Sequence, residues 1–256
     1  MGSPSSSSTT RRRKEIKEFV DEIENDDRIL QIFIIRHGQT NENVRRIIQG
    51  HQNTNLNDLG ISQAKTCGSL LQYVHFDAIW SSDLNRCIQT RDQALATQIG
   101  VLPKNRIHTT TAFRERSFGD LEGCEASVAT KILQRRGQNW MTAGEDVLQF
   151  QNKVLTGFDT AVADSQEHRF KRIAIVSHGG TIASLINGLL KRRGFRLSDH
   201  IPNSSLGNLG NTSITIVNVG GDDIGEVVEY NNGDHLTQGT DDDITQLMKA
   251  EVVDNF

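Results

Sequence analysis

The sequence predicts an α/β protein with a mostly parallel sheet, and three observations carry this prediction. Short, largely apolar runs at residues 32–35, 77–80 and 172–176 have the length of buried strands. Stretches with apolar residues at helical spacing separate them, so strands and helices alternate. No linker divides the 256 residues beyond the N-terminus, which favours one domain. Because a crossover helix returns the chain to the same end of the sheet, the strands should be parallel.

The N-terminal residues differ in composition from the rest of the chain. Residues 1–14 are Ser-rich and then basic, and we expect a disordered tail because they offer almost nothing to bury. Four apolar residues then recur at helical spacing: Ile16, Phe19, Val20 and Ile23. They predict a short helix within residues 15–28 that docks on the edge of the domain. The domain itself is expected at residues 29–240, ahead of an acidic segment at residues 241–256.

Between the first strand and residue 111, two helices and two further strands are predicted. A helical pattern covers residues 61–73, and the strand at residues 77–80 follows it. That strand ends at two serines, after which Asp83 offers a side chain that can serve as N-cap of the next helix. A weaker strand is predicted at residues 107–111.

The second half of the chain gives the clearest strand. Apolar residues keep helical spacing over residues 147–162, and the buried strand at residues 172–176 comes next. Another helix should follow over residues 182–189. Residues 212–219 and 226–230 flank a Gly-Gly pair and predict two closing strands.

Composition excludes several classes of protein. The net charge of −4 gives no support to a nucleic-acid partner or a membrane surface, and no apolar run reaches the ~20 residues of a membrane span. The N-terminus also lacks the apolar stretch of a secretory signal. Three cysteines, Cys67, Cys87 and Cys124, fit reduced thiols better than disulfides or a zinc site. We therefore expect a cytoplasmic protein, with the nucleus as the alternative.

Two of the predicted strands end in the same pair of residues. His37-Gly38 follows the first strand and His178-Gly179 follows the strand at residues 172–176. Strand ends of a parallel sheet meet at one edge, where α/β proteins bind ligands. A lone histidine at a strand end is more often structural, but two equivalent ones favour a site. Histidine can act as nucleophile or proton carrier near pH 7, and Arg36 beside it can bind a phosphate or carboxylate.

Two further segments offer matching chemistry. Arg86 lies in the first turn of a predicted helix, where the backbone also attracts anions, although a surface charge would fit the same position. Glu115 stands between Arg114 and Arg116, ahead of a glycine-rich loop. Taken alone, this glutamate would be read as a salt-bridged surface residue.

Together, these residues form four motifs. They read RHGQTNEN at residues 36–43, SDLNR at 82–86, FRERSFGDLEG at 113–123 and SHGG at 177–180. Their order and content resemble the histidine phosphatase superfamily, a phosphoglycerate-mutase-like group, and most of all its compact broad-specificity phosphatases. The resemblance covers roughly residues 30–235, with phenylalanine at position 113 in place of the usual leucine. It implies a single-domain, three-layer α/β/α sandwich.

The resemblance also implies roles for individual residues. His37 would be the nucleophile that forms a phosphohistidine, and Glu115 the general acid and base. Arg36, Arg86 and His178 would complete the catalytic group by surrounding the transferred phosphoryl oxygens. The implied phosphate-binding residues are Arg36, Asn43, Gln49, Arg86, His178 and Gly179. No acidic cluster has metal-ligand spacing, so we expect neither a metal nor a cofactor.

The motifs leave the reaction type partly open. The mutase branch carries a long insertion after the acid motif, whereas the stretch between Gly123 and Gly144 is short. We therefore favour a metal-independent phosphatase that hydrolyses small phosphorylated metabolites. The alternatives are a phosphoglycerate mutase, a fructose-2,6-bisphosphatase-like enzyme, a phosphoprotein phosphatase and a non-catalytic phosphate-binding protein. Arg45, Arg46, Arg135 and Arg136 are read as surface charges, with a second anion site as the alternative.

Overall fold

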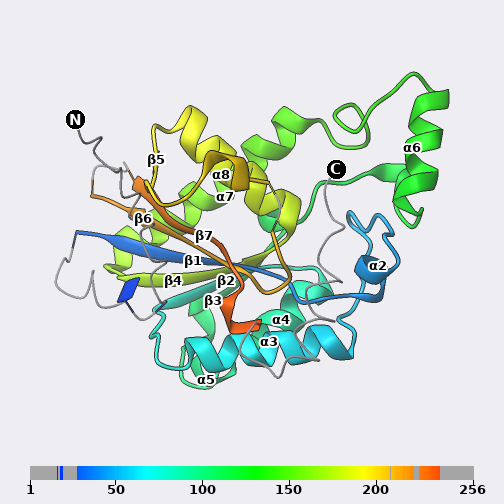
Figure 1. The fold of residues 1–256 in the computed structure, drawn as a ribbon. Helices are drawn as coiled ribbons and strands as arrows, with labels where there is room; N and C mark the ends of the chain where they lie inside the picture. Colours follow the sequence, from blue (N-terminus) through cyan, green and yellow to red (C-terminus); the bar gives the residue numbers. More distant parts are fainter. Residues whose placement is uncertain (1–15, 17, 20–27, 208, 222–224, 237–256) are drawn as a thin grey trace, which may run out of the picture.

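A seven-stranded sheet forms the centre of the molecule, in the strand order β3-β2-β4-β1-β6-β7-β5 (Figure 1). The computed structural model describes residues 16, 18–19, 28–207, 209–221 and 225–236. The strands are β1 (Leu30–Arg36), β2 (Ala78–Ser82), β3 (Ile107–Thr110), β4 (Arg172–Ser177), β5 (Arg196–Leu197), β6 (Ile214–Val219) and β7 (Gly225–Asn232). Strands β3, β2, β4 and β1 pair in parallel, as does β5 with β7, whereas β6 is antiparallel to both its neighbours.

Helices cover both faces of this sheet. The helices of the described residues are α2 (Asn41–Val44), α3 (Asp58–Leu71), α4 (Asn85–Ala94), α5 (Ala96–Ile99), α6 (Ala126–Arg135), α7 (Val147–His168) and α8 (Gly179–Arg192). Short 3₁₀ turns lie at Lys104–Arg106, Thr111–Phe113, Gly119–Leu121, Asn203–Ser205 and Asp234–Leu236. Figure 1 shows α7 and α8 on one face and α3, α4 and α5 on the other, with α6 set apart on the side of α2. The predicted three-layer, mostly parallel α/β architecture is confirmed.

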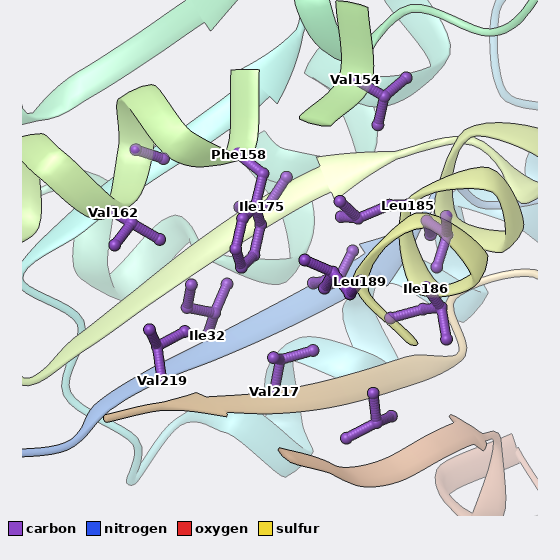
Figure 2. Packing of buried hydrophobic residues seen from close by; sticks show 14 of the residues in the cluster. Ile32, Val154, Phe158, Val162, Ile175, Leu185, Ile186, Leu189, Val217 and Val219 are labelled. Carbon is purple, nitrogen blue, oxygen red and sulfur yellow. The ribbon is translucent and has the colours of Figure 1, made fainter. Parts of the chain in front are cut away.

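The central strands are buried on both faces because their alternate side chains enter different cores. Ile32 and Ile34 of β1 belong to the core beneath α7 and α8, whereas Phe33 and Ile35 belong to the core beneath α3 and α4. Figure 2 shows the first of these cores, where side chains of α7 and α8 face those of β1, β4 and β6. An apolar run without alternation is what such a doubly covered strand requires.

A third, smaller cluster lies apart from the sheet. It joins α6 to the surrounding loops through Leu121, Ala129, Leu133 and Ala143. Ile48, which lies between α2 and α3, packs against it. This cluster fixes α6 beside the segment that follows β1, so two distant parts of the sequence meet at one end of the sheet.

The structure corrects one predicted cap. Asp83 is not the N-cap of α4, because that helix begins at Asn85 and its cap residue, Leu84, makes no side-chain hydrogen bond. Asp83 instead accepts two hydrogen bonds from Arg114, both of 2.6 Å. This bidentate ion pair draws the carboxylate away from the helix and lowers the pKa of Asp83. The short strand β5, which follows α8, has no counterpart among the predicted strands.

The other predicted strands and helices are present with small shifts at their ends. The closing strands are found as the antiparallel pair of β6 and β7. At the N-terminus, Ile16 and Phe19 are helical and buried in the core beneath α3 and α4. The predicted tail, the acidic segment at residues 241–256, Val20 and Ile23 lie outside the described residues.

Candidate active site

The two histidine-containing strand ends meet, as the sequence predicts. β1 and β4 are neighbours in parallel, with Arg36 beside Ser177, so His37 and His178 leave the sheet together. Their rings lie 5.2 Å apart between centroids, in an edge-on arrangement. Both imidazoles are buried, at 3% and 0% exposure. Strand register therefore sets the distance between the two rings.

The imidazole of His37 is held in one tautomer. Its Nδ1 lies 2.8 Å from the carbonyl oxygen of Gly38. Because a carbonyl can only accept, Nδ1 carries the proton and Nε2 keeps its lone pair. Burial lowers the pKa of His37 well below the usual histidine range, and the positive charges of Arg86 and Arg36 lower it further. The ring is thus neutral near pH 7.

Arg86 connects α4 to the second histidine. Its Nε donates to Nδ1 of His178 (3.1 Å), and its Nη atoms donate to the carbonyls of Gln52 (2.7 Å) and Gly50 (2.9 Å). His178 must therefore accept at Nδ1 and carry its proton on Nε2, which lies 2.9 Å from Oγ of Ser82. Burial, followed by the charge of Arg86, lowers the pKa of His178 well below its usual range.

Glu115 lies at the N-terminus of α8. Its carboxylate accepts from the backbone N–H of Gly180 (2.9 Å) in the first turn of that helix, and from the N–H of Arg116 (2.9 Å). His51 donates through Nε2 to the carbonyl of Glu115 (2.9 Å) and holds the loop from the other side. Helix N-termini attract anions because their first N–H groups lack partners within the helix. The carboxylate thus has a defined position at the edge of the site.

These side chains surround a cleft of about 1180 Å³. Seven of the eight predicted site residues line it: Arg36, His37, Asn43, Gln49, Arg86, Glu115 and Gly179. The eighth, His178, lies behind Arg86 in the hydrogen-bonded position already described. The lining also includes large apolar residues, which together are called the apolar wall: Ile47, Ile48, Phe118, Trp140, Met141, Val147, Phe150, Leu206 and Leu209. The cleft thus combines the predicted cationic residues with an apolar wall.

The two neutral predicted residues are fixed by neighbours in their own loops. Asn43 completes a capping box at α2, in which its Oδ1 accepts from the N–H of Thr40 (3.0 Å). Gln49 accepts through Oε1 from the hydroxyl of Thr54 (2.6 Å). Both residues line the cleft beside Arg86, where side-chain amides can donate to an anion.

Sequence reasoning missed the residues that hold the loop after β1. Thr90 accepts from the N–H of Gly38 (2.9 Å), and Gln63 accepts from the N–H of Gln39 (2.9 Å). Asn57 donates to the side-chain oxygen of Gln39 (2.9 Å). The sequence held one signal of this role: Gln63 and Thr90 are polar residues at positions of α3 and α4 that face the buried side.

The described part of the chain holds no group of three or more His, Cys, Asp or Glu side chains that could bind a metal ion. None of its helices combines the length and the apolar composition needed to cross a bilayer.

Comparison with known proteins identifies the class. The chain belongs to the histidine phosphatase superfamily (branch 1), whose family model matches residues 32–233. It is 33% identical over 230 residues to the broad-specificity phosphatase of Saccharomyces cerevisiae, covering 88% of this chain and 95% of that protein. It is 32% identical over 207 residues to a probable phosphatase of Schizosaccharomyces pombe, covering 81% and 95% of the two chains.

A solved structure agrees with these relatives. The mycobacterial glucosyl-3-phosphoglycerate phosphatase in complex with VO3 superposes with a TM-score of 0.62 at 26% identity, covering 79% of this chain and 98% of the other. The family inferred from the four motifs is confirmed, and the protein is a phosphoric monoester hydrolase.

Proposed function

We propose that this enzyme hydrolyses small-molecule phosphomonoesters without a metal, through a phosphohistidine on His37, with Glu115 as general acid and base. The observation that carries the proposal is the state of His37. Its imidazole is neutral, and Nδ1 donates its proton to the carbonyl oxygen of Gly38. The lone pair on Nε2 is therefore available for attack, beside Arg36 and Arg86 in the cleft. A neutral imidazole held in this way is a competent nucleophile near pH 7.

The reaction divides into two displacements at phosphorus. In the first, Nε2 of His37 attacks the phosphorus, the ester P–O bond breaks, and Glu115 gives its proton to the leaving oxygen. In the second, Glu115 takes a proton from water, the water oxygen attacks, and the P–N bond breaks. Inorganic phosphate leaves and His37 returns to its neutral form. Using one carboxyl group as acid and then as base leaves the enzyme unchanged after each cycle.

The surrounding groups stabilise charge on the phosphoryl oxygens. Arg36 and Arg86 are 5% and 1% exposed, so their charges act with little screening by water. The N-terminus of α8 adds backbone N–H groups at Gly179, and Asn43 and Gln49 add neutral donors. Positioned donors of this kind supply most of the catalysis in phosphoryl transfer.

The shape of the cleft favours water as the acceptor. One short helix, α6, stands between Gly123 and Gly144, and the cleft beneath it has a volume of about 1180 Å³. That exceeds the volume of a typical small-ligand pocket, ~300–1,000 Å³. A roomy cleft with an apolar wall admits varied leaving groups and water, whereas a mutase must retain its bisphosphorylated intermediate.

One observation keeps the mutase and bisphosphatase alternatives as a second candidate. Three further cations line the cleft beyond the phosphate-binding arginines: Arg46, Arg116 and Lys191. Arg46 had been read from the sequence as a surface charge. A substrate with a second anionic group would find partners here, as a phosphoglycerate or a sugar bisphosphate would.

Substitution of the nucleophile tests the proposal. His37→Ala should abolish hydrolysis of 4-nitrophenyl phosphate while the melting temperature stays close to that of the unaltered enzyme. Brief reaction with labelled substrate and an acid-free quench should leave acid-labile, base-stable phosphate on His37 of the unaltered protein. Turnover by the alanine variant would disprove the nucleophile assignment. Incubation with 3-phosphoglycerate and 2,3-bisphosphoglycerate separates the mutase from the phosphatase, since only a mutase forms 2-phosphoglycerate.

A further inference from the structure

The loop before β6 holds the end of β1 at the point where His37 leaves the sheet. β6 is antiparallel to β1, so residues 209–213 lie against Arg36 and His37. The N–H of Arg36 donates to the carbonyl of Ser213 (3.1 Å), and the N–H of Thr212 donates to the carbonyl of Arg36 (3.1 Å). The pairing therefore reaches Arg36, the last residue of β1, through residues that precede β6.

The peptide group between His37 and Gly38 is held at both ends. Its carbonyl accepts from the side-chain amide of Asn211 (2.9 Å) and from the N–H of Thr212 (3.4 Å). Its N–H donates to the hydroxyl of Thr90 (2.9 Å). The imidazole in turn donates through Nδ1 to the next carbonyl, that of Gly38 (2.8 Å). These bonds fix the backbone on both sides of the Cα of Gly38, and with it the carbonyl that orients the imidazole.

Thr212 adopts a costly backbone conformation to make these contacts. Its φ is +56°, in the left-handed region, and it is the only β-branched residue with a positive φ among the described residues. Such a conformation costs on the order of 1–3 kcal/mol, and glycine would adopt it without strain. Thr212 is fully buried. Its side chain must therefore do something that glycine could not.

That side chain connects the loop to His235. The Thr212 hydroxyl donates its hydrogen to the carbonyl of Asn211 (2.7 Å), so it accepts from Nε2 of His235 (3.0 Å). His235 is buried, and burial lowers its pKa to about 4, so the ring is neutral and protonated on Nε2. Its Nδ1 has no hydrogen-bond partner among the described residues. Burying a polar ring for one hydrogen bond costs stability, which favours a functional reason.

We propose that Asn211, Thr212 and His235 are positioning residues for phosphoryl transfer, which orient the His37–Gly38 peptide and through it Nε2 of the nucleophile. The inference rests on the proposed role of His37. None of the three residues touches the reacting atoms. Their effect comes from geometry, since a misplacement of ~1 Å can cost about 10²-fold in rate.

Two substitutions and two controls test this network. Asn211→Leu removes the donor to the His37 carbonyl at similar volume. Thr212→Val replaces only the hydroxyl and keeps the β-branched shape, whereas Thr212→Ser keeps the hydroxyl. Ser165→Ala removes another fully buried hydroxyl, which donates to Ala161 within α7 and does not touch the site. The readouts are kcat and KM for 4-nitrophenyl phosphate, the inhibition constant of inorganic phosphate, and the ring ¹⁵N resonances of His37.

Asn211→Leu and Thr212→Val should lower kcat about 10-fold or more while phosphate inhibition changes little, because both phosphate-binding arginines remain. Thr212→Ser should recover most of the loss, and Ser165→Ala should behave as the unaltered enzyme. The His37 resonances should show the Nδ1–H tautomer in the unaltered enzyme and lose it in the two variants. Unaltered kcat and resonances in both variants would overturn the proposal. So would an equal loss of turnover and phosphate binding, which indicates general disruption.

The same experiment separates this proposal from the function on which it rests. An unaltered enzyme that binds phosphate but turns over no phosphomonoester would contradict the proposed function. The ring resonances need no turnover, and in that case they alone decide whether Asn211 and Thr212 orient His37.

Discussion

The carboxylate of Glu115 lies directly against the backbone of Gly180. A Cβ atom at Gly180 would lie 2.5 Å from Oε1 of Glu115 and 3.0 Å from its Cδ. The Gly180 N–H also donates to the same carboxylate. One methyl group at this position would therefore push the proposed acid away from its site. Glycine at position 180 is explained by this close approach.

Gly180→Ala should thus displace the proposed general acid, Glu115, and leave His37 and the two arginines in place. We expect kcat/KM for alkyl phosphates to fall by about 10²-fold, within the range that general acid catalysis contributes. 4-Nitrophenyl phosphate should lose far less, because its leaving group departs without a proton. Stability should hold, since alanine is favoured over glycine within a helix by about 1 kcal/mol. The ratio of kcat/KM for the two substrates is the measurement.

A matched control exists in Gly233, around which a Cβ would meet nothing within 4 Å. Gly233→Ala should leave both substrates unaffected. An equal loss of both substrates in Gly180→Ala would indicate damage to the phosphate site and would contradict the role given to Glu115.

The low pKa of His37 predicts where activity should fail in acid. As the proposed nucleophile, His37 must be neutral, and burial and two arginines hold its pKa well below 6.5. Protonation of the His37 imidazole, which would prevent attack, therefore occurs only at a pH well below the usual histidine range. We expect the acidic limb of kcat/KM that reports on the nucleophile to lie below pH 6.5, measured with an aryl phosphate whose own ionisation is corrected for. A limb at pH 6.5 or higher would contradict a buried, neutral His37.

At the scale of elements, α6 forms a unit of its own over the cleft. Its small cluster contains Leu133, which is 2% exposed, and none of the sheet residues. The same unit contributes Trp140 and Met141 to the apolar wall. Of the proposed phosphate-binding residues, Asn43 and Gln49 come from α2 and the loop after it, and the others come from the strand ends and from α4 and α8. The two arginines proposed to bind phosphate are thus built on parts of the structure other than the α6 unit.

Leu133→Ala should consequently weaken leaving-group binding and leave phosphate binding unchanged. Replacing a buried leucine by alanine costs about 2–5 kcal/mol of stability, so the small cluster of four buried residues around α6 should lose its packing. We expect KM to rise for phosphomonoesters with bulky apolar leaving groups, with little change in inhibition by inorganic phosphate. Leu148→Ala, on the exposed side of α7, is the control because its side chain is 66% exposed. Equal changes in KM and phosphate inhibition would show that α6 is coupled to the phosphate site.

The elements were predictable where local patterns dominate. The apolar runs of β1 and β4 indicated buried strands, and the two strands pair in the sheet. The cap at Asp83 was wrong because Arg114, far away in sequence, takes the carboxylate. No local pattern reveals a partner that lies 31 residues further along the chain. Long-range ion pairs override capping preferences in this way.

At the scale of the whole molecule, the same distinction applies to the site. The resemblance predicted seven of the residues that line the cleft, because the proposed nucleophile, acid and arginines have characteristic neighbours in sequence. It did not predict Asn211, Thr212 or His235, which act on His37 from nearly two hundred residues away in the chain. The positive φ of Thr212 has no sequence signal either, since threonine disfavours it. The sheet, which sets β6 beside β1, is what makes these contacts.

Burying neutral histidines also makes the whole molecule sensitive to acid. His37, His178 and His235 all have pKa values lowered by burial, that of His235 to about 4 from 6.5. Below pH 6.5 the unfolded chain binds protons that the folded protein does not. These histidines therefore cost no stability above pH 6.5, and the free energy of unfolding decreases as the pH falls toward their folded-state pKa. Over this interval, each such histidine lowers the free energy of unfolding by about 1.4 kcal/mol per pH unit.

Replacing one of these histidines should remove its part of the stability loss in acid. His235→Gln keeps a side-chain donor for Thr212 but cannot be protonated in this range. We expect its free energy of unfolding to fall less between pH 7 and pH 5 than that of the unaltered protein, by about 2 kcal/mol, measured by urea denaturation at both pH values. His168→Gln is the control, because its half-exposed side chain is hydrated in both states. If His235→Gln loses as much stability in acid as the unaltered protein, the buried ring does not bind its proton on unfolding.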